Sequence, residues 1–124
     1  MLLRRVHAVV AWLFVAAIMV QVFLAGAAIA NLGGSGNFAT HIEFGYTGVF
    51  VAWAALLVSA LAARPGRREI GYVLLVLLLY IVQTALPSAK ASAPWVAALH
   101  PVNALLLFGL VAWYARRASR AAKA

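Results

Sequence analysis

Four long apolar segments separated by short loops are the feature that most constrains this chain. They lie at about residues 6–30, 38–63, 70–86 and 95–114. A helix rises about 1.5 Å per residue, so about 20 apolar residues cross a hydrocarbon layer of about 30 Å. We therefore predict an all-α integral membrane protein with a single transmembrane domain over residues 1–124, in which 115–124 form a basic cytoplasmic tail.

Composition supports a membrane protein and excludes several other classes. Of the 124 residues 67% are hydrophobic, and the mean hydropathy of +1.02 is too high for an ordinary soluble domain. The net charge of +8 comes from residues at the ends of the apolar segments rather than from a nucleic-acid-binding patch. With no cysteine, any cofactor must be held by nitrogen or oxygen ligands. The N-terminus begins like a signal peptide, but its apolar run is long enough to be a retained span.

The short loops and the basic residues predict the topology. Short connections make successive helices antiparallel, which gives an up-down-up-down four-helix bundle. Nine basic residues fall on one side of it, and only Lys90 falls on the other. The nine are Arg4, Arg5, Arg64, Arg67, Arg68, Arg116, Arg117, Arg120 and Lys123. Because basic residues stay on the cytoplasmic side, we expect a multi-pass protein with both termini in the cytoplasm.

This topology gathers the buried polar residues in the outer leaflet. His41 and His100 lie near the outer ends of the second and fourth segments, and Gln21 and Gln83 lie in the outer parts of the first and third. Asn103 is at a related depth. Polar groups are costly in lipid, so an intramembrane histidine is a functional hypothesis by default.

The two halves of the sequence share a pattern. In each half a Val-Gln pair is followed by a loop and then by a histidine, which comes twenty residues after Gln21 and seventeen after Gln83. The pattern is typical of a duplicated helical hairpin, and chance similarity is the alternative. Two such hairpins related by an axis along the membrane normal would bring the histidines face to face.

Small residues follow each histidine on the same helical face. Gly45 and Gly48 stand four and seven residues after His41, and Ala104 stands four after His100. A flat macrocycle between two helices needs such small neighbours. We therefore predict that a b-type haem binds between the two histidines as axial ligands of its iron, in an electron-transfer or haem-handling module. The predicted acceptors of hydrogen bonds from the non-ligating ring nitrogens are Gln21, Gln83 and Asn103.

Other interpretations stay open. The polar residues equally suit hydrogen bonds that hold helices together in an accessory subunit of a larger membrane complex, or a pocket for a quinone or lipid. A zinc or copper site at His41, Glu43 and His100 is disfavoured because residues two apart do not share a helical face. Glu43 is better explained as a first-turn acid, and His7, beside Arg4, as a solvated residue at the interface. No set of hydrolytic residues is apparent, which argues against an enzyme.

The Val-Gln pair, the proline-bearing outer loop and the sequence ALH with a small residue four positions on resemble one half-bundle of the haem A synthase family. The resemblance implies that His41 and His100 stand where that family places its paired haem ligands. Ile or Pro follows the histidine where the family has Arg or Gln, and only one four-helix unit is present, so the resemblance does not extend to the family's oxidation reaction. The chain is also similar to small four-span bacterial membrane proteins, which implies a bacterial cytoplasmic membrane.

Overall fold

The computed structural model describes residues 1–34, 36–64 and 66–124. All regular structure within these residues is helical. The elements are α1 (Leu2–Ile29), α2 (Ala39–Tyr46), α3 (Gly48–Ala63), α4 (Arg67–Ala85), the 3₁₀ helix η1 (Leu86–Lys90), α5 (Pro94–Ala97) and α6 (His100–Ala121). Four stretches are long and apolar enough to cross a membrane: Leu2–Ile29, Ala39–Ala63, Arg67–Lys90 and Pro94–Ala121. The predicted all-α fold with four spans is confirmed.

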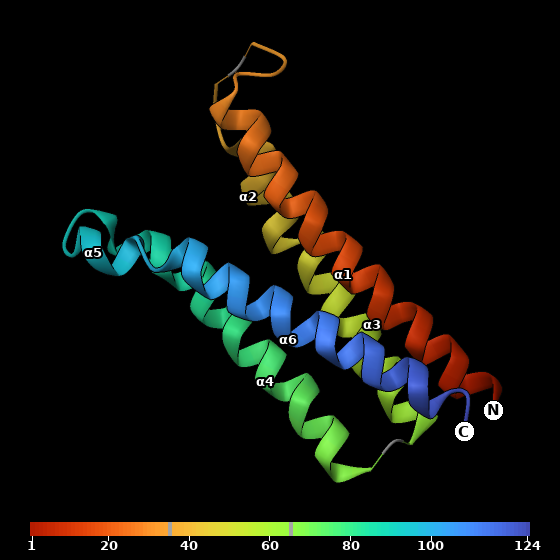
Figure 1. Cartoon of the computed structure of the whole chain (residues 1–124). Coiled ribbons are helices and arrows are strands. Elements are labelled where there is room, and N and C mark those ends of the chain that lie inside the picture. Colours follow the sequence, from red (N-terminus) through yellow and green to blue (C-terminus); the bar gives the residue numbers. More distant parts are fainter. Residues whose placement is uncertain (35, 65) are drawn as a thin grey trace.

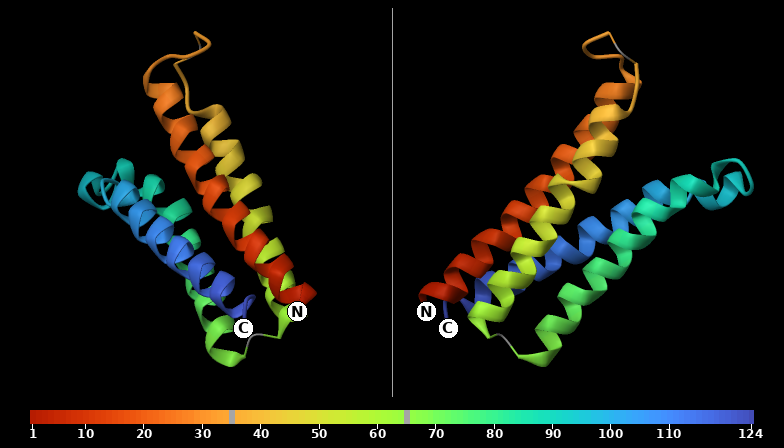
Figure 2. Two further views of the ribbon diagram at one scale, coloured as in Figure 1. Left: turned by 45° about the vertical axis from the view of Figure 1, so that its right-hand side comes forward. Right: turned by 180° about the vertical axis from the view of Figure 1, so that it is seen from behind.

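The helices form two hairpins that join at one end (Figures 1 and 2). One hairpin consists of α1 with α2 and α3, and the other of α4 and α6 with the short helices between them. Helix α1 contacts both α3 and α6, and α4 completes the bundle by contacting α3 and α6. The chain termini and the α3–α4 connection lie together at the joined end, which we call the basic end, while the two hairpins separate towards the other end, the histidine end.

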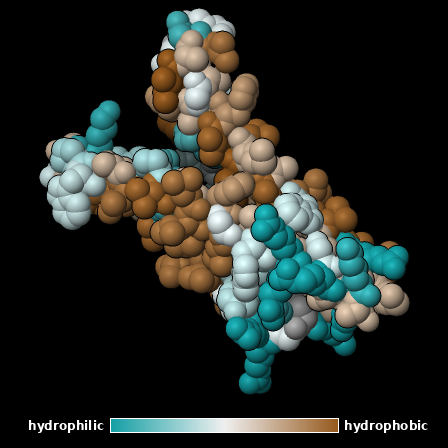
Figure 3. Space-filling model, in the orientation of Figure 1, coloured by the Kyte–Doolittle hydropathy of each residue, from teal (hydrophilic) through white to brown (hydrophobic). Residues whose placement is uncertain are grey.

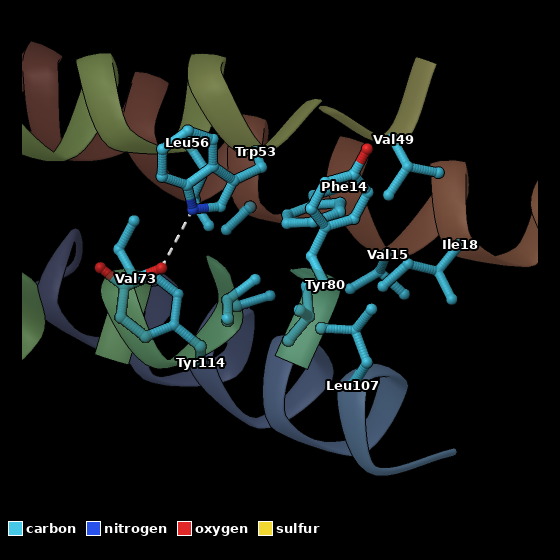
Figure 4. Packing of buried hydrophobic residues seen from close by; sticks show 14 of the residues in the cluster. Phe14, Val15, Ile18, Val49, Trp53, Leu56, Val73, Tyr80, Leu107 and Tyr114 are labelled. Carbon is cyan, nitrogen blue, oxygen red and sulfur yellow. Dashed lines mark hydrogen bonds between the residues drawn. The ribbon is translucent and has the colours of Figure 1, made fainter. Parts of the chain in front are cut away.

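Side chains from all four long helices fill the bundle near the joined end (Figure 4). Phe14 on α1, Leu56 on α3, Val76 on α4 and Val111 on α6 are completely buried. Side chains packed tightly in this way make more dispersion contacts with one another than they would make with lipid chains. These contacts stabilise the association of the helices. The core also contains a polar contact between the hairpins, since the indole Nε1 of Trp53 donates a hydrogen bond to the carbonyl oxygen of Val73 at 3.1 Å.

The second span is interrupted at Thr47, between α2 and α3. Here the hydroxyl of Tyr80 lies 3.2 Å from the carbonyl oxygen of Gly45 and 3.4 Å from that of Tyr46. Main-chain carbonyls at a helix break need such partners inside a membrane, where water is scarce. Tyr80 therefore provides a hydrogen-bond donor to main-chain carbonyls at the interruption of the second span.

The fourth span begins with a separate short helix. Helix α5 ends at Ala97 and α6 begins at His100, with Pro101 at the start of α6. Proline is tolerated there because its missing N–H would be unpaired in any first helical turn. Of the two roles that Pro101 suggests, a bend within one helix or the start of a new one, the structure has the second.

Helix α6 continues well beyond the predicted end of the fourth span. It extends to Ala121, so much of the predicted basic tail is helical. Ala118 and Ala122 pack against Ala8 of α1, which lets the two backbones come close at the basic end. This extension also covers residues near the start of α1 that a shorter helix would leave exposed.

Candidate functional site

The imidazole rings of His41 and His100 meet between the two hairpins. Their centroids are 6.3 Å apart and their planes are inclined at 71°. His41 projects from the first turn of α2, and His100 is the first residue of α6. Both side chains are partly buried. The structure thus brings together two histidines that the sequence places in separate spans.

Each histidine is held by the glutamine of its own hairpin. The Nδ1 atom of His41 lies 3.0 Å from the main-chain oxygen of Gln21, and the Nδ1 atom of His100 lies 2.9 Å from that of Gln83. A carbonyl oxygen only accepts hydrogen bonds, so Nδ1 carries the proton in both rings. In the neutral form of each imidazole the Nε2 lone pair is then available to a hydrogen-bond donor or a metal ion.

The glutamine side chains approach those Nε2 atoms. The amide nitrogen of Gln83 lies 3.1 Å from Nε2 of His100, and that of Gln21 lies 3.3 Å from Nε2 of His41. Gln21 also donates to the main-chain oxygen of His41 at 2.9 Å. Of the acceptors predicted for the non-ligating nitrogens, Gln21 and Gln83 do accept, through their main-chain oxygens. Asn103 instead contacts the side chain of Gln83.

The two half-sites differ at the third residue after each histidine. Asn103 donates to the side-chain oxygen of Gln83 at 2.8 Å and to the main-chain oxygen of Leu79 at 2.9 Å. Phe44 occupies the corresponding position after His41 and cannot donate a hydrogen bond. The side-chain oxygen of Gln21 is accordingly buried with no hydrogen-bond partner among the described residues. The His41 half-site thus retains an unused acceptor that the His100 half-site lacks.

The small residues of α2 and α3 have structural partners of their own. A Cβ atom on Gly45 would lie 2.7 Å from the amide nitrogen of Gln21, and one on Gly48 would lie 2.5 Å from the ring of Phe44. Gly45 therefore makes room for Gln21, and Gly48 makes room for Phe44. The expectation that both leave open space for a macrocycle needs correction. Ala104 remains partly buried on α6, one turn beyond His100.

A metal site of three protein ligands is not formed. Within residues 1–34, 36–64 and 66–124 no group of three or more His, Asp or Glu side chains converges. Glu43 is exposed and is the fifth residue of α2, so the expected first-turn position is also wrong. The zinc or copper interpretation therefore lacks its third ligand, whereas a metal centre with two axial histidines needs none.

Most of this site lies within a region that matches a protein family. Residues 21–90, more than half of the chain, match a model described as a family of unknown function (DUF6220). The chain belongs to this family. The DUF6220 region includes Gln21, His41 and Gln83, which are three of the four residues in the two His-Gln pairs. No curated protein and no solved structure matches the chain significantly.

A second polar cluster, at the basic end, was missed by sequence reasoning. His7 is only 3% exposed, and its Nδ1 and Nε2 atoms lie 2.9 Å from the hydroxyl groups of Ser59 and Tyr114 respectively. The prediction of a solvated residue was wrong because α6 continues past Tyr114 and covers this face of α1. The sequence does place Ser59 and Tyr114 near the same end of their spans as His7, and this was the one signal that could have predicted the cluster.

Proposed function

We propose that the chain binds one b-type haem between His41 and His100 and acts as an electron-transfer or haem-handling module of the membrane. The observation that carries the proposal is the separation of 6.3 Å between the two ring centroids. A bond from a metal ion to an imidazole nitrogen is about 2.0–2.1 Å long, and the ring centre lies roughly 1.1 Å behind that nitrogen. Two imidazoles on opposite sides of one iron therefore have centres about 6.4 Å apart.

The hydrogen bonds of the histidines support the same proposal. An axial histidine binds iron through a nitrogen without a proton while its other nitrogen donates to a carbonyl or carboxylate. His41 and His100 both have this arrangement, with Nδ1 committed to a main-chain oxygen. Iron would replace the glutamine amide as the partner of each Nε2 atom. The amide of Gln21 would then be free to reorient, together with its unpartnered oxygen.

The two hairpins separate towards the histidine end (Figures 1 and 2). In the space-filling view a notch divides the two arms above the joined end, with hydrophilic atoms at its base and apolar atoms along both arms (Figure 3). A porphyrin has an apolar face and edge that suit such walls. Repacking of the arms around it would remove apolar surface from the notch.

A bound haem would supply one-electron chemistry, because its iron changes between the ferric and ferrous states. The resemblance to a haem A synthase half-bundle agrees with this proposal, without that family's oxidation reaction. We further propose a bacterial cytoplasmic membrane with both termini in the cytoplasm, which places the histidine end near the outer surface. The electron donor or acceptor is then a membrane-bound redox partner or a larger complex.

A second candidate function rests on the His-Gln pairs themselves. Each pair joins two helices of one hairpin through contacts between 2.9 and 3.3 Å. Such hydrogen bonds stabilise membrane helix pairs, each by about 0.6–2 kcal/mol. On this account the polar residues are structural, and the chain is an accessory subunit without a cofactor.

Absorbance distinguishes the two candidates. The protein is purified from haem-replete cells and also titrated with haemin as the apoprotein. Haem binding predicts a Soret band that saturates at one haem per chain, and loss or a large shift of that band in His41→Ala and in His100→Ala. Glu43→Gln is the matched control, since this exposed carboxylate lies two residues from His41 and should leave the spectrum unchanged.

The fold of each variant is checked by size-exclusion chromatography in detergent, so that an unfolded variant is not counted as a lost ligand. A wild-type protein that stays colourless after haemin titration overturns the proposal. Retention of the unaltered Soret band by both alanine variants overturns it equally.

A further inference from the structure

A cavity of about 460 Å³ opens at the basic end of the bundle, far from the histidine pair. Its volume is within the range of about 300–1,000 Å³ that is typical of small-molecule sites. The start of α1, the end of α6 and the first turn of α4 form its walls. The lining residues are Arg4, His7, Ala63, Glu69, Tyr114, Arg117, Ala118, Arg120, Ala121 and Ala124. On the face shown in the space-filling view, the largest group of strongly hydrophilic residues lies at this end (Figure 3).

The positive charge in this cavity exceeds the negative charge available from side chains. The chain has only two acidic residues, Glu43 and Glu69, and Glu43 lies at the histidine end. Glu69 is already paired, since Nη2 of Arg117 lies 2.7 Å and Nε lies 2.8 Å from its Oε1 atom. No acidic side chain is left for Arg4 and Arg120. Both guanidinium groups are exposed and available to an anion from outside the chain.

Two of the lining residues, His7 and Tyr114, belong to a neutral hydrogen-bonded group that also includes Ser59. The hydroxyl of Ser59 donates to the main-chain oxygen of Leu56 at 3.0 Å, so its oxygen can accept a proton from Nδ1 of His7. Nε2 of a neutral His7 then accepts the hydroxyl proton of Tyr114. Each donor of this group therefore already has an acceptor. An anion in the cavity would therefore be bound by the exposed side chains of Arg4 and Arg120.

We propose that this cavity binds a phosphate group through Arg4 and Arg120. Guanidinium groups match phosphate oxygens in geometry and charge better than any other side chain. The cavity lies just beyond the apolar part of four membrane spans, at the level where phospholipid phosphates are found. The group is either the phosphodiester of an anionic lipid or a free phosphate from solution, because both present the same oxygens.

Two double variants separate a defined site from general attraction to a basic protein. Arg4→Gln with Arg120→Gln removes the cavity charges. Arg67→Gln with Arg116→Gln removes two exposed arginines from the same end that do not line the cavity. Both pairs change the net charge equally. Equal denaturation temperatures in a zwitterionic detergent without added anion establish that the fold is intact.

Retention of phosphatidylglycerol is measured by native mass spectrometry, and binding of inorganic phosphate by the shift in denaturation temperature. We expect the wild type and the Arg67/Arg116 variant to bind alike, and the Arg4/Arg120 variant to bind on the order of tenfold more weakly. Binding of the lipid alone identifies a headgroup site, and binding of inorganic phosphate identifies a soluble ligand. Equal weakening in both double variants, or no binding of either probe by the wild type, overturns the proposal.

Discussion

The ring of His41 lies 6.3 Å from that of His100, and each ring donates a proton from Nδ1 to the main-chain oxygen of the glutamine in its own hairpin. This arrangement leaves each Nε2 atom as an acceptor, and the amide nitrogens of Gln83 and Gln21 lie 3.1 and 3.3 Å from Nε2 of His100 and of His41. Two imidazoles in this state have no reason to attract each other, since neither presents a donor at Nε2. In the proposed haem complex, iron would replace these two amides as the partner of the Nε2 atoms.

A substitution at Gly45 tests whether the side chain of Gln21 is held against His41. In Gly45→Ala the new methyl group would lie 2.7 Å from the amide nitrogen of Gln21 and displace it. We expect a loss of about 1–3 kcal/mol in the free energy of unfolding. Gly71→Ala is the control, because a Cβ atom there meets nothing within 4 Å and alanine favours helix by about 0.5–1 kcal/mol. Equal stability of both variants would show that Gln21 is not held as described.

Tyr114 tests the polar cluster at the basic end. Tyr114→Phe removes the hydroxyl that lies 2.9 Å from Nε2 of the buried His7 and leaves that nitrogen without a partner. The expected cost is about 1–3 kcal/mol of unfolding free energy. Tyr46→Phe removes the same group from a side chain that is 58% exposed and should cost little. Thermal unfolding in detergent compares the two, and equal midpoints would argue against a structural role for the His7 cluster.

Trp53 tests the contact between hairpins in the core. Trp53→Phe removes the hydrogen bond from Nε1 to the oxygen of Val73 and part of a buried ring. We expect the unfolding free energy to fall by about 1–2 kcal/mol. Trp95→Phe changes a ring that is 72% exposed and should leave the unfolding midpoint in place. If the two substitutions have the same effect, the hairpins are not coupled through this bond.

The absence of cysteine allows the orientation to be measured without background labelling. Ser92→Cys places a thiol in the connection between η1 and α5, and Ala124→Cys places one at the basic end. With both termini in the cytoplasm, a membrane-impermeant maleimide should label the first variant in intact cells and the second only after lysis. The reverse pattern would place the histidine end at the cytoplasmic surface.

The sequence was sufficient to predict the spans and the level of the two central histidines. Apolar length fixes the number of crossings, and the alternation of short loops fixes which ends lie together. The hydrogen bonds that hold the two histidines could not be predicted in detail, because they depend on how each helix is rotated about its axis. Gln21 and Gln83 support the histidines with main-chain rather than side-chain oxygens, a choice that composition does not encode.

The basic end was harder to anticipate for a related reason. His7 follows two arginines, so its neighbours suggest exposure, yet the continuation of α6 to Ala121 buries it. Alanines in the last turns of α6 allow that helix to lie close to α1. The arginines near these alanines did not reveal this packing, because basic residues are expected at a cytoplasmic end whether or not the helix packs against α1.

The electron paramagnetic resonance spectrum of the ferric, haem-loaded protein tests the central claim most directly, because it reports both axial ligands at once. Two imidazole ligands predict low-spin iron. Ring planes that keep their inclination of 71° when iron binds would give a strongly anisotropic signal rather than the rhombic signal of parallel rings. Replacing either His41 or His100 by alanine should convert the iron to the high-spin state. A high-spin spectrum from the wild type would contradict the account.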